Sequence, residues 1–171
     1  MIYLTGDFVW KELEKLIKAV GENGRTILIS SPGGDLGVGL ALYDFIRLKN
    51  PVITLGVGEV ASAAFLAFLG GDIRLALPNT VFNFHSIYVR FEDAIKELSP
   101  KDVIDLAKEL DFCNRLAFKI IKERTKITYK DIKDLGRQGQ TFGSDRALKL
   151  GIIDGIINSL DFSDLKINLE K

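Results

Sequence analysis

Short apolar runs rich in branched residues alternate along this 171-residue chain with segments in which apolar residues recur at helical spacing. The runs that predict strands are "IYLTG", "RTILIS", "VITLGV", "DIRLALP", "VFNFH" and "GIIDGII". The segments that predict the main helices between them are residues 9–20, 35–48 and 62–69. This alternation predicts an α/β fold with a mixed sheet.

Residues 100–125 predict one long helix. Ser99 supplies an N-cap and Pro100 takes the first helical position. At about 1.5 Å per residue this helix would be roughly 39 Å long, about the width of a compact domain of this size, so it must project or lie across an edge. Its apolar positions on more than one face are Val103, Leu106, Leu110, Leu116 and Phe118. We expect it to be the oligomerisation element of a single domain spanning residues 1–171.

Composition and charge exclude several classes of partner. Lys plus Arg and Asp plus Glu number 23 each, and no dense basic block occurs, so nucleic acid is not an expected partner. No apolar stretch is long enough to span a bilayer, and the first ten residues lack the regions of a signal peptide. The one cysteine, Cys113, cannot form an internal disulfide, which suits a reducing compartment. These features predict a cytoplasmic protein without a membrane span.

A glycine-rich turn, "SSPGGDLGVG", joins a predicted strand to a predicted helix. Gly37 and Gly39 lack a third glycine three residues later, and no Lys-Ser or Lys-Thr pair follows, so neither the dinucleotide nor the P-loop motif fits. Gly33 and Gly34 could instead present backbone N–H groups to an oxyanion. A plain strand-to-helix turn is the alternative.

One hydroxyl interrupts the apolar stretch "VASAAFLAFLGG", at Ser62. It follows a predicted strand and begins a predicted helix, whose first N–H groups have no intrahelical partner. Its alanine neighbours allow the sharp strand-turn-helix geometry that exposes a nucleophile. The N–H of Ala63 would then point at a developing oxyanion with the helix dipole behind it. The alternative is that Ser62 only caps the helix.

His85 is the only histidine and ends the alternating run "VFNFH". Alternation puts His85 on the face opposite to Phe82 and Phe84, so it would face a cleft if the phenylalanines face the core. A serine nucleophile needs an adjacent base, and with a single histidine only one imidazole can play that part. A structural histidine is the alternative.

Five segments together resemble the ClpP family, the proteolytic subunit of the Clp protease, and its phage-encoded relatives. In chain order they are "IYLTG", "ISSPGGDLGVGLALYDFI", "VITLGVGEVASAAFLAFLGG", "RLALPNTVFNFH" and "ALKLGIIDGII". The resemblance implies a ClpP/crotonase-type β-β-α superhelix with a protruding long helix after the histidine strand. It also implies a homo-oligomeric ring that encloses serine endopeptidase sites, acts on peptides or unfolded proteins, and needs no cofactor or metal.

Four residues carry over from the family pattern to this sequence. Ser62 matches the nucleophile and His85 matches its base. Gly34, in the turn "SPGG", and Ala63, after the serine, match the two donors of the oxyanion hole.

The family's third catalytic residue, an aspartate, is absent from its expected place. Counting back eight positions from Ala147 gives Gly139, with Gln140 next to it, and neither is a carboxylate. A Ser-His pair should be slow unless a backbone carbonyl, the Gln140 side chain or Asp134 orients His85. Gly139→Asp should then raise the rate, provided that Gly139 does not need a positive φ.

Three other functions stay open. A lysine from the segment after residue 90 could replace His85 as base, as in the Ser-Lys peptidases of the signal-peptide peptidase A family. The chain could be a catalytically silent ring subunit, because the aspartate is missing. A crotonase-type acyl-CoA enzyme would share the oxyanion architecture, although such chains are usually much longer. We also expect the amino-terminal segment through which ClpP meets its unfoldase to be lacking, so an ATPase partner stays open.

Overall fold

The computed structural model describes residues 1–21, 25–49, 51–89, 97–133 and 139–158. Its strands are β1 (Ile2–Thr5), β2 (Thr26–Ser31), β3 (Ile53–Ala61), β4 (Ile73–Ala76), β5 (Val81–Phe84), β6 (Gln140–Gly143) and β7 (Gly155–Ile156). Its helices are α1 (Leu13–Gly21), α2 (Leu36–Leu48), α3 (Ala63–Phe68), α4 (Pro100–Arg124), α5 (Tyr129–Lys133) and α6 (Ser144–Lys149), with a 3-10 turn, η1 (Trp10–Glu12).

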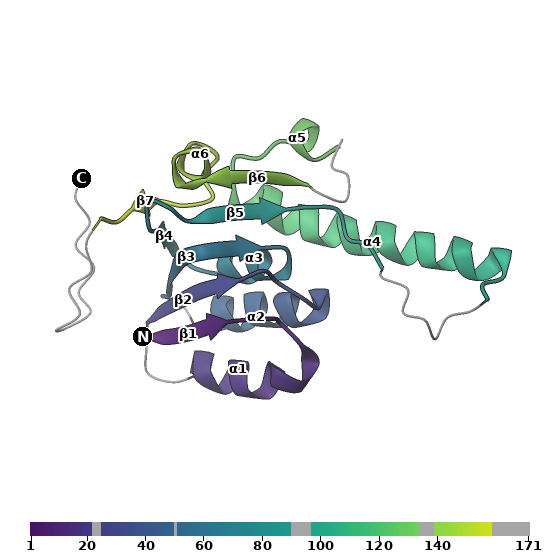
Figure 1. Cartoon of the computed structure of the whole chain (residues 1–171), viewed down its shortest axis with the longest axis horizontal. Coiled ribbons are helices and arrows are strands. Elements are labelled where there is room, and N and C mark those ends of the chain that lie inside the picture. Colours follow the sequence, from purple (N-terminus) through teal and green to yellow (C-terminus); the bar gives the residue numbers. More distant parts are fainter. Residues whose placement is uncertain (22–24, 50, 90–96, 134–138, 159–171) are drawn as a thin grey trace.

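The described strands form one mixed sheet (Figure 1). β1, β2, β3, β4 and β7 lie side by side and run parallel. β3 pairs first with β4 and then, over Glu59 to Ala61, with β5, which also runs parallel to it. β6 joins β5 in the antiparallel sense. The mixed α/β fold that the alternation predicts is therefore present.

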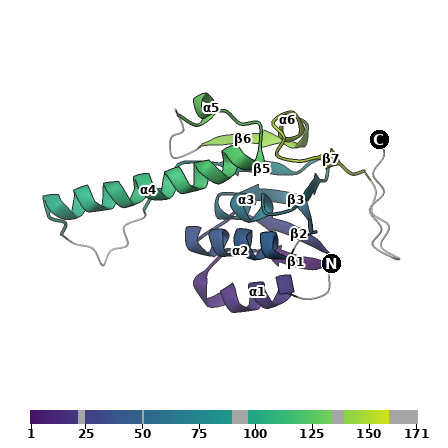
Figure 2. The same ribbon diagram turned by 180° about the vertical axis from the view of Figure 1, so that it is seen from behind.

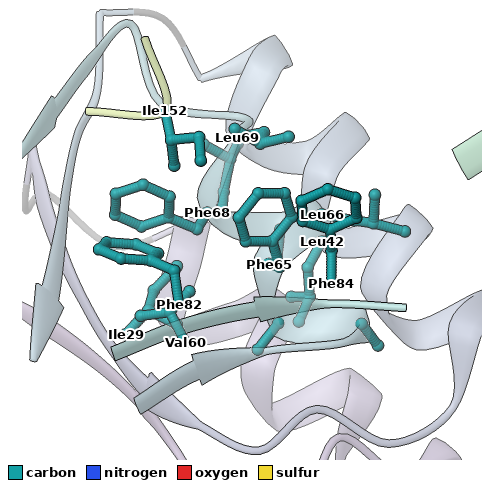
Figure 3. Packing of buried hydrophobic residues seen from close by; sticks show 14 of the residues in the cluster. Ile29, Leu42, Val60, Phe65, Leu66, Phe68, Leu69, Phe82, Phe84 and Ile152 are labelled. Carbon is teal, nitrogen blue, oxygen red and sulfur yellow. The ribbon is translucent and has the colours of Figure 1, made fainter. Parts of the chain in front are cut away.

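The core lies between the sheet and the helices α1, α2 and α3, which cover one of its faces (Figure 2). Phe65 and Phe68 of α3 pack against Phe82 and Phe84 of β5 (Figure 3). The ring centroids of Phe68 and Phe82 are 5.4 Å apart, and those of Phe65 and Phe84 are 5.5 Å apart. The phenylalanines of β5 thus face the core, as their alternation with His85 predicts.

Helix α3 is enclosed on every side, since all six of its residues are buried. Gly39 allows α2 to approach it closely. A Cβ at Gly39 would lie 2.6 Å from the carbonyl oxygen of Ala63 and 2.8 Å from its Cβ. The backbone of α3 is therefore fixed by packing from α2 on one side and from β5 on another.

Helix α4 begins at a capping box between Ser99 and Asp102 and projects well beyond the sheet (Figures 1 and 2). Its buried residues lie near its carboxyl end, at Ala117, Ile120 and Ile121. Its large apolar side chains that stay exposed are Val103, Ile104, Phe112 and Leu116. The long helix predicted over residues 100–125 is confirmed within one residue, and it leaves apolar surface uncovered in the single chain. Among the described residues, no helix combines the length and apolar character needed to cross a membrane.

Three details of the sequence prediction differ from the structure. The strand predicted at "VITLGV" continues to Ala61, because Glu59 to Ala61 pair with β5. The last strand is confined to Gly155–Ile156, where it pairs with β4. β6 was not predicted, because "QTFG" has no clear apolar alternation and becomes a strand only by pairing with β5.

The packing of α2 on α3 predicts that Gly39→Ala destabilises the protein. The added methyl group would overlap Ala63, so we expect a loss of roughly 1–3 kcal/mol in the free energy of unfolding. Gly21→Ala is the control, because nothing lies within 4 Å of a Cβ built there. Urea unfolding would measure both, and equal stability of the two variants would contradict the packing described.

Candidate active site

A cavity of about 800 Å³ lies where three parallel strands end. Gly33 and Gly34 follow β2, Ser62 directly follows β3, and His85 directly follows β5. Because parallel strands end at the same edge of a sheet, these residues meet although they are far apart in sequence. All four line the cavity, together with Ala63. The structure thus brings together the predicted nucleophile, base and backbone donors.

Ser62 has a strained backbone. Its φ of 54° and ψ of −123° lie outside the regions that side chains favour, and it is the only non-glycine residue with positive φ in the described chain. Its N–H donates to the carbonyl of Asn83 at 3.0 Å, and its own carbonyl accepts from Phe65 at 3.1 Å. The Ser62 hydroxyl makes no capping hydrogen bond to α3. Its side chain therefore does not act as the helix cap, which was the alternative interpretation.

Gly33 and Gly34 bring the turn after β2 against two neighbours. A Cβ at Gly33 would lie 2.7 Å from the Ser62 Cβ and 2.8 Å from the Ala63 nitrogen, while a Cβ at Gly34 would overlap the backbone of Phe8. Both glycines have positive φ, at 99° and 141°. Side chains are thus excluded at both positions, and the turn lies directly on the backbone that carries Ser62.

Two backbone N–H groups that line the cavity with Ser62, those of Gly34 and Ala63, are available as hydrogen-bond donors. Ala63 is the first residue of α3, so its N–H has no intrahelical partner. Within the described residues, neither the N–H of Ala63 nor that of Gly34 has a hydrogen-bond partner. Two such donors beside one hydroxyl can hold the oxyanion that forms when the hydroxyl attacks a carbonyl.

Ser31 fixes the glycine turn, and the sequence analysis missed it. This buried hydroxyl donates to the carbonyl of Gly6 at 2.6 Å and accepts from the N–H of Gly33 at 3.0 Å. Phe8 adds a backbone bond to the Gly33 carbonyl, at 2.7 Å. The second serine of "SSPGG" is the signal that could have indicated it, since a buried strand hydroxyl needs a partner.

His85 is half-buried, and its ring is oriented by its own chain. Nδ1 lies 2.8 Å from the carbonyl oxygen of Ser86. Because a carbonyl only accepts, Nδ1 must carry the proton in this hydrogen bond, which leaves the lone pair on Nε2. No hydrogen bond joins the Ser62 hydroxyl to the His85 ring among the described residues. Such contacts are often long before substrate binds.

The position expected for the third catalytic residue lies directly beside His85. A Cβ at Gly139 would lie 2.5 Å from the His85 Cβ and would overlap the Phe84 carbonyl oxygen. Gly139 also has a φ of 63°, so the condition attached to Gly139→Asp is not met. The backbone at Gly139 therefore lies against the backbone and Cβ of His85, and it has no room there for a side chain.

Two alternatives from the sequence analysis can be compared with the described residues: other groups that orient His85, and a lysine that replaces it as base. The Gln140 side chain donates to the carbonyl of Asp131 at 3.0 Å. Asp134 lies outside the described residues. No described lysine lines the cavity, and residues 90–96 also lie outside the described part of the chain. Among the described residues, the contact that orients the ring is the Ser86 carbonyl, which is the backbone carbonyl among the three possibilities expected.

Arginine side chains lie at the carboxyl end of α3, opposite to Ser62. Arg124, the last residue of α4, donates to the carbonyls of Leu69 and Gly71 at 3.0 and 2.6 Å. Burial lowers the pKa of Arg124, and the charges of Arg74 and Arg47 lower it further. Positive charge at the carboxyl end of a helix complements its dipole, so this cluster favours α3 in the orientation that places its amino end at Ser62.

Comparison with known proteins shows which family the chain is similar to. A family model described as Clp protease matches residues 9–160. The ATP-dependent Clp protease proteolytic subunit 1 of Streptomyces avermitilis is 31% identical over 153 residues, which cover 86% of this chain and 68% of that protein. The structure of a point mutant of ClpP1 from Listeria monocytogenes matches with a TM-score of 0.79 at 26% identity, covering 96% of this chain and 94% of that one.

The crowding at Gly139 reverses the expected effect of an aspartate there. Gly139→Asp and Gly139→Ala should both displace His85, lower the rate of peptide hydrolysis near pH 8 and destabilise the fold by roughly 1–3 kcal/mol. Gly6→Ala is the control, because Gly6 has a φ of 74° but nothing lies within 4 Å of a Cβ there. A faster Gly139→Asp enzyme of unchanged stability would contradict this account.

Proposed function

Because the chain belongs to the Clp protease family, we propose that it is a serine endopeptidase with Ser62 as nucleophile and His85 as base. The observation that carries the proposal is the strained backbone of Ser62, which shares one cavity with His85 and with two unpartnered N–H donors. Backbone strain of this kind persists only where the surrounding structure enforces it, and it is concentrated at active sites.

The reaction follows from the placement of these groups. Nε2 of His85 accepts the proton of the Ser62 hydroxyl as the oxygen attacks the peptide carbonyl carbon. The negative charge that forms on the carbonyl oxygen accepts hydrogen bonds from the N–H groups of Gly34 and Ala63. His85 then donates its proton to the leaving amine, which leaves an acyl group on Ser62. A water molecule, activated by the same imidazole, releases the acyl group.

In this mechanism the Ser86 carbonyl takes the place of an aspartate. It holds the proton on Nδ1, so that Nε2 is the basic nitrogen. A neutral carbonyl stabilises the imidazolium less than a carboxylate does, and the loss of the carboxylate from a full triad costs about 10⁴ in rate. We therefore expect slow turnover, with the oxyanion donors and substrate binding supplying most of the acceleration.

The proposed substrate is an extended peptide or an unfolded protein. Apolar side chains from five parts of the chain line the cavity: Val9, Leu36, Leu66, Ile87, Ala117 and Phe118. Such walls favour a substrate with apolar side chains near the bond to be cut. A folded domain cannot place its backbone beside the half-buried Ser62, so the segment must be extended.

The proposed assembly is a homo-oligomeric ring of single-domain subunits. Its support is the apolar surface of α4, where Phe112 is 61% exposed and Val103 is 52% exposed in the single chain. Large apolar side chains left exposed along a projecting helix are typical of a surface that is covered by another subunit. A catalytically silent ring subunit is the second candidate, because neither Gly139 nor Gln140 supplies a carboxylate at the expected position.

Covalent labelling tests the nucleophile. A fluorophosphonate probe should modify Ser62, as located by mass spectrometry, and Ser62→Ala should abolish both labelling and peptide hydrolysis. His85→Ala should slow both by about 10²-fold or more, because the hydroxyl loses its base. Heat-unfolded wild-type protein is the control and should not be labelled. Labelling at another residue would remove the proposal, and an unlabelled but correctly folded wild type would favour the silent subunit.

Sedimentation velocity tests the assembly. The wild type should sediment as an oligomer at micromolar concentration, and Phe112→Glu should shift it towards smaller species, because a charge would have to be buried in the interface. Lys101→Glu, at an exposed position in the first turn of α4, is the matched control. A monomeric wild type, or equal behaviour of both variants, would argue against assembly through this helix.

A further inference from the structure

Residues 86–88 surround the His85 ring without forming a helix or strand. The Ser86 carbonyl accepts the bond from Nδ1. The ring of Tyr88 lies 5.4 Å from the imidazole, centroid to centroid, with 38° between their planes. An irregular segment therefore supplies two contacts that orient the imidazole. Ile87, between them, packs its side chain against the core, and its backbone N–H is anchored by a separate contact.

Asn114, on α4, supplies that anchor. Its Oδ1 accepts a hydrogen bond from the N–H of Ile87 at 2.8 Å. Its Nδ2 donates to the carbonyl of Leu110, one helical turn earlier, also at 2.8 Å. The second bond fixes which end of the amide faces Ile87, since the nitrogen would repel the Ile87 N–H. Asn114 thus ties the residue between Ser86 and Tyr88 to a rigid helix.

We propose that Asn114 is a positioning residue for His85, acting through Ile87 to hold the Ser86 carbonyl and the Tyr88 ring against the imidazole. Asn114 thereby helps to orient His85, which is one of the roles of the aspartate in a full triad. The carbonyl selects the tautomer, and the aromatic face lies close enough to stabilise the positive charge that the imidazole gains during the reaction. The inference rests on the proposed function, because His85 must be the base for its orientation to affect the rate.

Kinetics of two Asn114 variants test the proposal. Asn114→Ala removes the acceptor for Ile87 and should lower kcat by about tenfold with little change in KM, because only the base is misaligned. Asn114→Asp keeps an acceptor oxygen and should retain most of the activity. Alanine favours helix more than asparagine does, so α4 should still form in Asn114→Ala. The labelling rate of Ser62 should fall with kcat.

Control variants separate positioning from general damage to the site. Arg115→Ala, next along α4, should leave both rates unchanged, because the exposed Arg115 pairs with Asp111 on the same helix. Phe118→Leu changes an apolar side chain of the cavity wall but removes no hydrogen bond to Ile87, so it should raise KM for peptides with little change in kcat. Tyr88→Leu should lower kcat, because the aromatic ring beside the imidazole is lost.

A spectroscopic readout tests the same proposal without any activity. Since His85 is the only histidine, ¹⁵N-labelled histidine gives a single pair of ring nitrogen signals. The neutral wild-type ring should carry its proton on Nδ1. Asn114→Ala should shift the ring towards the Nε2–H form that free imidazole side chains prefer, and Asn114→Asp should resemble the wild type.

The two readouts distinguish failure of this proposal from failure of the proposed function. If Ser62 is labelled but Asn114→Ala keeps both the wild-type kcat and the Nδ1–H form, the positioning role is wrong and the peptidase stands. If wild-type Ser62 is not labelled, the peptidase proposal fails, and the ¹⁵N signals of the variants still decide whether Asn114 orients His85.

Discussion

The strained backbone at Ser62 is the constraint on which the site depends. A non-glycine residue at a φ of 54° is costly, so its neighbours must hold it there. Gly33 and Gly39 remove the side chains that would push α3 away, and the Asn83 carbonyl holds the Ser62 N–H. The aromatic contacts between α3 and β5 and the arginine contacts beyond α3 complete the support. The Ser62 hydroxyl and the Ala63 N–H are therefore held in fixed positions at the edge of the core.

The base is held by a different kind of structure. Ser62 stands between a central strand and a fully buried helix, whereas His85 precedes an irregular segment that is held by the side chain of Asn114 on α4 and by the packing of Ile87 on the core. A carboxylate would supply both orientation and charge. Here a backbone carbonyl supplies orientation, and an aromatic ring lies beside the imidazole. A mechanism of this kind relies more on the oxyanion donors than on stabilisation of the imidazolium.

The sequence predicts those parts of the site that depend on local pattern. The elbow at Ser62, the face of His85 and the extent of α4 follow from neighbouring residues, and the structure places them as expected. Gly139 was located beside His85 by counting, but its positive φ and its contact with Phe84 could not be read from the chain. The bond between Asn114 and Ile87 was also not predictable, because it joins residues 27 positions apart through one side-chain rotamer.

The central claim is that Ser62 attacks a carbonyl whose oxygen is held by two backbone N–H groups. The most direct measurement is a crystal structure of the protein after reaction with a fluorophosphonate, whose tetrahedral phosphorus stands in for the attacked carbon. We predict a covalent bond from the Ser62 oxygen to phosphorus, with the phosphoryl oxygen within about 3 Å of the nitrogens of Gly34 and Ala63. A phosphoryl oxygen bound to neither N–H, or an adduct on another residue, would contradict the account.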